Sequence, residues 1–142
     1  MAIILKTEQI VLKTKGYTDI INITPGVQKF VDDNGLVEGQ LLIFINGSTA
    51  AISTVEYEPG LLKDIPDALD KIAPMNTRYH HDDTWHDGNG YAHVRSTLMG
   101  SSFTVPVFEG RLVLGTWQQI ILLDFDNSPR NRNVTLQFIG EK

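Results

Sequence analysis

The chain has 142 residues, a formal net charge of -5 at pH 7 and no cysteine. A chain of this length is expected to form a single domain over residues 1–142, and the lack of cysteine excludes disulfide frameworks, thiol nucleophiles and zinc–thiolate sites. The acidic balance argues against general binding to nucleic acid or to a membrane surface, because both need a basic field. Residues 1–10 lack the features of a signal peptide and no apolar run reaches the length of a membrane span, so a cytoplasmic location is expected.

The first half of the chain predicts strands and one helix. Two stretches rich in β-branched residues, 2–13 and 18–23, predict strands. A short helix is expected over 24–35, because Thr24 can cap its start and Pro25 suits its first turn.

An almost unbroken apolar run at 40–46 predicts a buried strand, with 49–57 as its neighbour. Residues 60–72 have apolar side chains at helical spacing, and Pro66 is expected to bend this helix or to delay its start. The remaining predicted elements are a helix over 89–99 and strands over 103–107, 118–126 and 133–140. About seven strands and two or three helices that do not alternate strictly predict an α+β fold.

All four histidines lie within residues 79–93, YHHDDTWHDGNGYAH. Neutral imidazole is the commonest metal ligand in proteins and also titrates near neutral pH. His81, His86 and His93 with a carboxylate can therefore bind a divalent metal ion such as zinc or magnesium. Their spacing matches no established metal motif. An acid–base centre and a solvated polar loop are the alternatives, and the residues alone leave them open.

Two carboxylates and one cation are further candidates. Asp87 can orient a histidine or act as a general base, whereas Glu56, at the end of a predicted strand, is equally typical of a surface residue. Arg95 on the third helix is the favoured phosphate ligand, because guanidinium binds phosphate through two N–H groups. The basic segment 130–132, RNR, is about as typical of a solvated turn as of a phosphate contact.

Small polar residues beside glycine form the last group. Ser48 and Thr49 follow Gly47 and can offer hydroxyl and backbone N–H donors to a phosphate, although turn formation is the ordinary role of such residues. Gln118 can hydrogen-bond a ligand or simply begin a strand.

With these residues identified, the chain resembles the YjbQ-like family, also described as the secondary thiamine-phosphate synthase family. The resemblance covers nearly the whole chain, and the phrase GRLVLGTWQQI at 110–120 is distinctive when it follows HVRSTLMG at 93–100. The segments that carry it are 47–60, 81–93, 100–126 and 129–141.

The resemblance implies a two-sheet α+β sandwich that assembles as a homotrimer around a threefold axis. It also implies a site for a small phosphorylated substrate, supported by a divalent metal ion, with a weak activity that joins pyrimidine diphosphate and thiazole phosphate to give thiamine phosphate. The implied catalytic residues are Glu56, Asp87 and His93. The implied metal ligands are His81, His86 and His93. The implied substrate-binding residues are Ser48, Thr49, Asn89, Arg95 and Gln118.

The chain departs from the family pattern at two positions. Many members have a histidine where this chain has Gly47, and an Asn-Glu pair where it has Val55 and Glu56. The departure puts the named synthase activity in doubt. A metal-dependent hydrolase and a non-enzymatic trimeric protein that binds a metal or ligand are therefore kept as alternatives.

Overall fold

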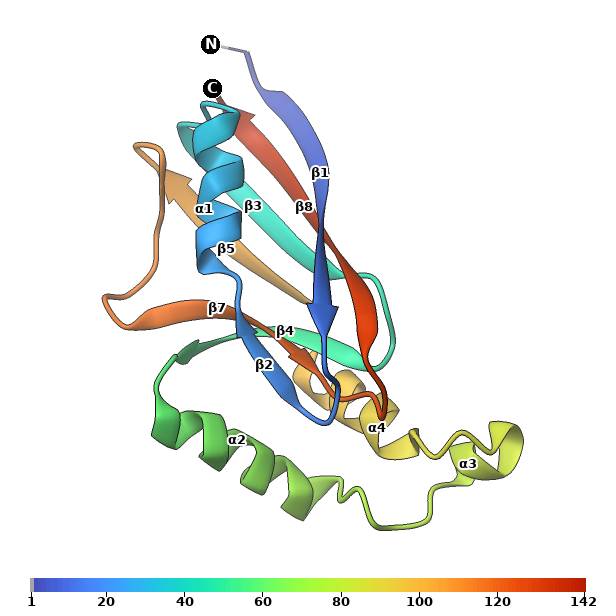
Figure 1. Cartoon of the computed structure of the whole chain (residues 1–142). Helices are drawn as coiled ribbons and strands as arrows, with labels where there is room; N and C mark the ends of the chain where they lie inside the picture. The colour runs from blue at the N-terminus through green and yellow to red at the C-terminus, as the bar shows by residue number, and fades with distance from the viewer. Residues whose placement is uncertain (1) are drawn as a thin grey trace.

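The computed structural model describes residues 2–142, which form eight strands in two sheets and four helices (Figure 1). The strands are β1 (Ile4–Thr14), β2 (Asp19–Asn22), β3 (Glu38–Ile45), β4 (Ala50–Glu56), β5 (Ser102–Phe108), β6 (Arg111–Leu112), β7 (Gln118–Asp124) and β8 (Arg130–Glu141). The helices are α1 (Thr24–Asp33), α2 (Pro59–Ile72), α3 (His80–Trp85) and α4 (Gly90–Met99). The predicted α+β sandwich is confirmed.

The larger sheet is antiparallel and has the strand order β1-β8-β3-β5-β6. Side chains alternate between its two faces, as the pleat requires. The inner face carries a buried aliphatic and aromatic set that packs on α1 and on one face of the smaller sheet. Its members from the larger sheet are Leu41, Ile43, Ile45, Val105, Val107, Val134, Leu136 and Phe138.

The smaller sheet, β2-β7-β4, lies between the larger sheet and the helices α2 and α4 (Figure 1). Its second face forms another buried cluster, in which Ile121, Leu123 and Phe125 meet Leu69 of α2 and Ala92 of α4. Because both faces of β7 are covered, this strand is an almost continuous apolar run. At one end of this layer Glu56 is exposed and Gln118 half-buried, whereas Ala50 and Asp124 at the other end are buried.

Two glycines let β3 and β8 approach closely. Gly39 and Gly140 face each other in the register of these strands, and the aromatic ring of Phe138 covers both. A Cβ atom at Gly140 would lie 2.2 Å from the carbonyl oxygen of Glu38 and 2.6 Å from Cα of Gly39. Any side chain at either glycine would push the strands apart.

Two local expectations differ from the structure. The hydroxyl of Thr24 does not cap α1 but accepts a hydrogen bond of 2.7 Å from the Ile120 amide, which ties the helix start to β7. Helix α2 starts at Pro59, earlier than predicted, and continues through Pro66. The carboxylate of Glu58 makes this start stable, because it accepts hydrogen bonds from the amides of Gly60 and Leu61.

Candidate functional site

A buried group of charged side chains lies where β7 ends and β8 begins. The guanidinium of Arg132 binds both carboxylate oxygens of Asp124, with Nε to Oδ2 at 2.7 Å and Nη2 to Oδ1 at 2.8 Å. Thr14 donates a further hydrogen bond to Asp124. This paired geometry fixes the arginine, because both hydrogen bonds to Asp124 must break before its planar group can turn.

The group continues to a second carboxylate. Nη2 of Arg132 donates to Thr49 Oγ1 at 2.7 Å, and the Thr49 hydroxyl donates to Asp126 Oδ2 at 2.9 Å. Arg130 donates from Nε to the same oxygen at 3.0 Å. Two arginines are thus matched by two carboxylates, which leaves this region close to neutral overall.

Hydrogen bonds keep both carboxylates charged. Burial alone would raise the pKa of Asp124, but bonds from Arg132 and Thr14 outweigh it and lower that pKa below 3.8. Burial likewise opposes the charge of Asp126, and bonds from the Asn127 amide and from Thr49 lower its pKa.

The histidines His81 and His93 lie next to this group, at the junction of α3 and α4. Their ring centroids are 4.2 Å apart. His81 Nε2 lies 3.1 Å from the side-chain amide of Asn89 and 3.5 Å from Asp87 Oδ1. The Asn89 amide nitrogen reaches Asp126 at 3.3 Å in one orientation and Asp87 at 3.0 Å in the other, so it links the histidines to the carboxylates.

Burial and the neighbouring ring both disfavour protonation of His93. Burial is the larger effect on its pKa, which is lowered from 6.5, and the charge of His81 lowers it further. The neutral form of His93, which can accept a proton, is therefore favoured.

These elements surround an open depression of about 400 Å³. The hydroxyl-bearing turn between β3 and β4 forms one wall, the start of β8 another, and the start of α4 the third. The residues that line it are Gly47, Ser48, Thr49, Asn89, His93, Asp126, Arg130, Asn131 and Arg132.

Several predicted site residues come together here. Ser48, Thr49, Asn89 and His93 line the depression, and His81 and Asp87 contact Asn89 beside it. His86 does not join them. It ends α3 in the left-handed conformation, with φ of 59°, and its exposed side chain makes no hydrogen bond within residues 2–142.

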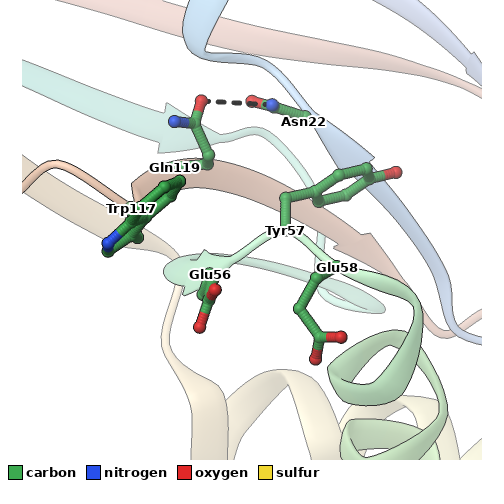
Figure 2. Close-up of a pocket in the computed structure, with 6 residues that line it drawn as sticks. All are labelled: Asn22, Glu56, Tyr57, Glu58, Trp117 and Gln119. Atoms are coloured by element: carbon green, nitrogen blue, oxygen red, sulfur yellow. Dashed lines mark hydrogen bonds between the residues drawn. The ribbon is translucent and has the colours of Figure 1, made fainter.

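Glu56 and Gln118 lie at the opposite end of the smaller sheet, where they face each other in register. Strand β4 runs from the depression to Glu56, a span of about 20 Å at roughly 3.3 Å per residue. Glu56 lines a separate pocket with Asn22, Tyr57, Glu58, Trp117 and Gln119 (Figure 2). Within one chain, Glu56 and Gln118 therefore do not reach the depression.

Arg95 is also separate from the depression. Its buried guanidinium donates to the carbonyl of Ala73 at 2.9 Å and to Thr18 Oγ1 at 2.8 Å, and it pairs with Asp70 at 3.4 Å. These bonds tie α4 to the end of α2 and to the turn after β1. The guanidinium groups that line the depression belong instead to Arg130 and Arg132.

The predicted metal ligands do not form a metal site in this conformation. No group of three or more His, Asp or Glu side chains within residues 2–142 is arranged to hold a metal ion. His81 and His93 pack ring against ring, and His86 is not grouped with them. The divalent metal ion stays a prediction, which metal analysis of the purified protein tests.

The comparisons with known proteins agree with the fold. The family model described as "UPF0047 protein YjbQ-like" matches residues 8–141. The UPF0047 protein of Archaeoglobus fulgidus is 40% identical over 91% of this chain and 98% of its own length. UPF0047 protein YugU of Bacillus subtilis is 37% identical over 96% of this chain and 99% of its own length.

A solved structure from Sulfolobus solfataricus, described as a YbjQ-like protein of unknown function, superposes with a TM-score of 0.92 at 32% identity. The superposed region covers 99% of this chain and 100% of the Sulfolobus chain. The protein is thus an α+β sandwich with a polar depression between its sheets and α4. It belongs to the YjbQ-like UPF0047 family, which confirms the resemblance. Within residues 2–142, no helix is long and apolar enough to cross a membrane.

Proposed function

We propose that the depression binds a small phosphorylated molecule. The observation that carries this proposal is the convergence of two arginines, two hydroxyl-bearing residues and a histidine on one open space of about 400 Å³. Guanidinium and hydroxyl groups are the donors that phosphate oxygens prefer. The volume suits a small molecule better than a polymer.

The two arginines take different parts in this proposal. Arg130 is about half exposed, at 48% of its side chain, and uses Nε for Asp126, so its outer N–H groups face solvent beside the depression. Ser48, on the turn before β4, lines the same space, whereas the hydroxyl of Thr49 already donates to Asp126. Because the carboxylates balance the arginines, directed N–H and O–H groups rather than net charge would hold the phosphate.

His93 is placed to exchange a proton with the bound molecule. It lines the same space and its pKa is lowered by burial, which favours the neutral form that a general base requires. In the weak synthase reaction the thiazole nitrogen carries no proton and bonds to the pyrimidine methylene carbon as the C–O bond to diphosphate breaks. The arginine side and the N–H of His93 would then stabilise the departing diphosphate. The same groups would also serve a hydrolase, with Asp87 beside His81 as a second base, or a protein that only binds its ligand.

The first test is calorimetric titration of the purified protein with inorganic pyrophosphate. Wild-type protein is expected to bind it, and Arg130→Gln to weaken binding about tenfold, because one charged donor is lost. Arg78→Gln is the matched control, since Arg78 is an exposed arginine paired with Asp83 away from the depression. Absence of binding to wild-type protein would refute the proposal.

Two further measurements distinguish between the possible roles of the site. His93→Gln is expected to retain pyrophosphate binding but to lose turnover of pyrimidine diphosphate with thiazole phosphate. Equal turnover in both proteins would remove His93 from the chemistry. Titration with and without EDTA, together with the metal content of the protein, tests the divalent metal predicted from the sequence.

We also propose that the chain forms a homotrimer through the outer face of its larger sheet. The strand register places five apolar side chains on this face, and all are exposed in the single chain. They are Leu5, Val11, Phe44, Phe108 and Ile139. Apolar groups spread over one sheet face favour burial against another copy.

Sedimentation velocity at micromolar concentration is expected to give a species of three chains. The double variant Leu5→Lys and Ile139→Lys is expected to sediment as a monomer, because the two residues are paired neighbours on β1 and β8. The control is Glu8→Lys, which changes the charge by the same amount on β1 but lies on the opposite face of the sheet, paired with Leu136. A monomeric wild-type protein would contradict the proposal.

A further inference from the structure

One nitrogen of Arg132 has no protein partner, although the residue is only 7% exposed. Nε and Nη2 bind Asp124 and Thr49. Nη1 makes no hydrogen bond within residues 2–142. The residue lines the depression. Within residues 2–142, Tyr91 Oη is the one side-chain polar atom that is both closed off from solvent and without a hydrogen bond. Nη1 also lacks a hydrogen bond but is not closed off, so solvent reaches it. Nη1 therefore opens toward the depression.

The opening exists because position 47 has no side chain. A Cβ atom at Gly47 would lie 2.8 Å from Nη1 of Arg132, closer than side-chain atoms normally approach. A flexible arginine could move away from such an atom. Arg132 cannot move freely, because its two bonds to Asp124 and its bond to Thr49 hold the guanidinium plane.

Gly47 does not need to be glycine for its own backbone. It is not among the residues with positive φ, so alanine is compatible with its conformation. The neighbouring space is also free apart from Arg132, since no other residue approaches a Cβ at this position within 4 Å. The bare Cα at position 47 thus has one structural consequence, which is access to Nη1.

We propose that Nη1 of Arg132, uncovered by Gly47, is the donor that holds a phosphoryl oxygen of the ligand, and that residue 47 decides whether such a ligand can enter. This inference rests on the proposed function of the depression. It adds which atom would hold the phosphate and which residue controls access to that atom. A buried, prealigned guanidinium loses little conformational entropy on binding, unlike the exposed Arg130. Arg132 therefore contributes the fixed contact and Arg130 the adjustable one.

The test compares pyrophosphate binding by wild-type protein and by Gly47→Ala in calorimetric titrations. Gly47→Ala is expected to weaken binding by at least about tenfold, because the added methyl group covers a charged donor. Gly115→Ala is the matched control: its Cβ would meet only Gln118 at 3.7 Å, away from the depression, and its binding is expected to equal that of wild type. Thermal melting followed by circular dichroism shows whether both variants are folded.

The outcomes separate this inference from the proposed function. If folded Gly47→Ala binds pyrophosphate like wild type while Arg130→Gln does not, the anchoring role of Nη1 is wrong and the proposed function stands. If wild-type protein does not bind pyrophosphate, both fail.

If Gly47→Ala does not fold, the side-chain ¹⁵N resonances of arginine in wild-type protein decide. Addition of pyrophosphate is expected to shift the Nη signals of Arg132. A shift confined to Arg130 would overturn the inference.

Discussion

Replacement of Asp124 by asparagine is expected to lower the free energy of unfolding by about 3–5 kcal/mol, the usual cost of breaking a buried ion pair from one side. The change leaves the guanidinium of Arg132 buried and turns an amide nitrogen toward it. The nearest remaining carboxylate, Asp126, lies 3.8 Å from Nη2 and already accepts from Thr49. It can therefore compensate only in part.

Urea denaturation at pH 7 measures this loss. Asp83→Asn is the control, because its partner Arg78 is exposed and surface ion pairs contribute about 0–1 kcal/mol. The folded-state pKa of Asp124 is lowered below 3.8, so its contribution is complete above that value and is lost as pH falls through the folded-state pKa. The asparagine variant should lack this acid-dependent loss. Equal stability of the two variants at pH 7 would show that Arg132 is not bound as described.

Gly140→Ala is expected to destabilise the protein by about 3 kcal/mol, at the upper end of typical overpacking costs. The new methyl carbon would lie 2.2 Å from the carbonyl oxygen of Glu38, and backbone atoms cannot turn away as a side chain can. The strands β3 and β8 would have to separate at this point. Ladder hydrogen bonds and the contact of Phe138 would both weaken.

Gly26→Ala is the matched control for this change. Gly26 lies in the first turn of α1, and its nearest neighbour for a Cβ is Ile10 Cδ1 at 3.7 Å. Alanine should stabilise the helix there by up to about 1 kcal/mol. Opposite signs for the two variants in one series of denaturation curves are the expected result. A Gly140→Ala protein as stable as wild type would mean that the strands are not in close contact.

Periodicity was sufficient to predict most of the fold. The apolar run at 40–46 and the helical spacing at 60–72 reflect burial on sheets and helices, which depends directly on side-chain type. Two elements were not predicted. Helix α3, HHDDTW, has no apolar face and no buried residue, and β6 has only two residues, so neither leaves a periodic signal.

The candidate site was only partly predictable, because it depends on which face of an element a residue occupies. On a helix, residues two apart point in different directions, so α4 does not present His93 and Arg95 to the same space. On a strand, residues two apart share a face, which is why Arg130 and Arg132 come together. The sequence RNR carried that signal, but its strand was predicted to begin only at 133.

The position of β8 between β1 and β3 has a consequence for how the protein folds. Strands β1 and β3 do not pair with each other, and both pair with β8. Until residues 130–141 join, the long edges of β1 and β3 lack neighbours, and the contacts that complete them span most of the chain, as between Gln9 and Thr135. Folding dominated by such distant pairing is slow and exposes strand edges to other molecules in the meantime. The same strand positions Arg132, so the lining of the depression and the sheet are completed in one late event.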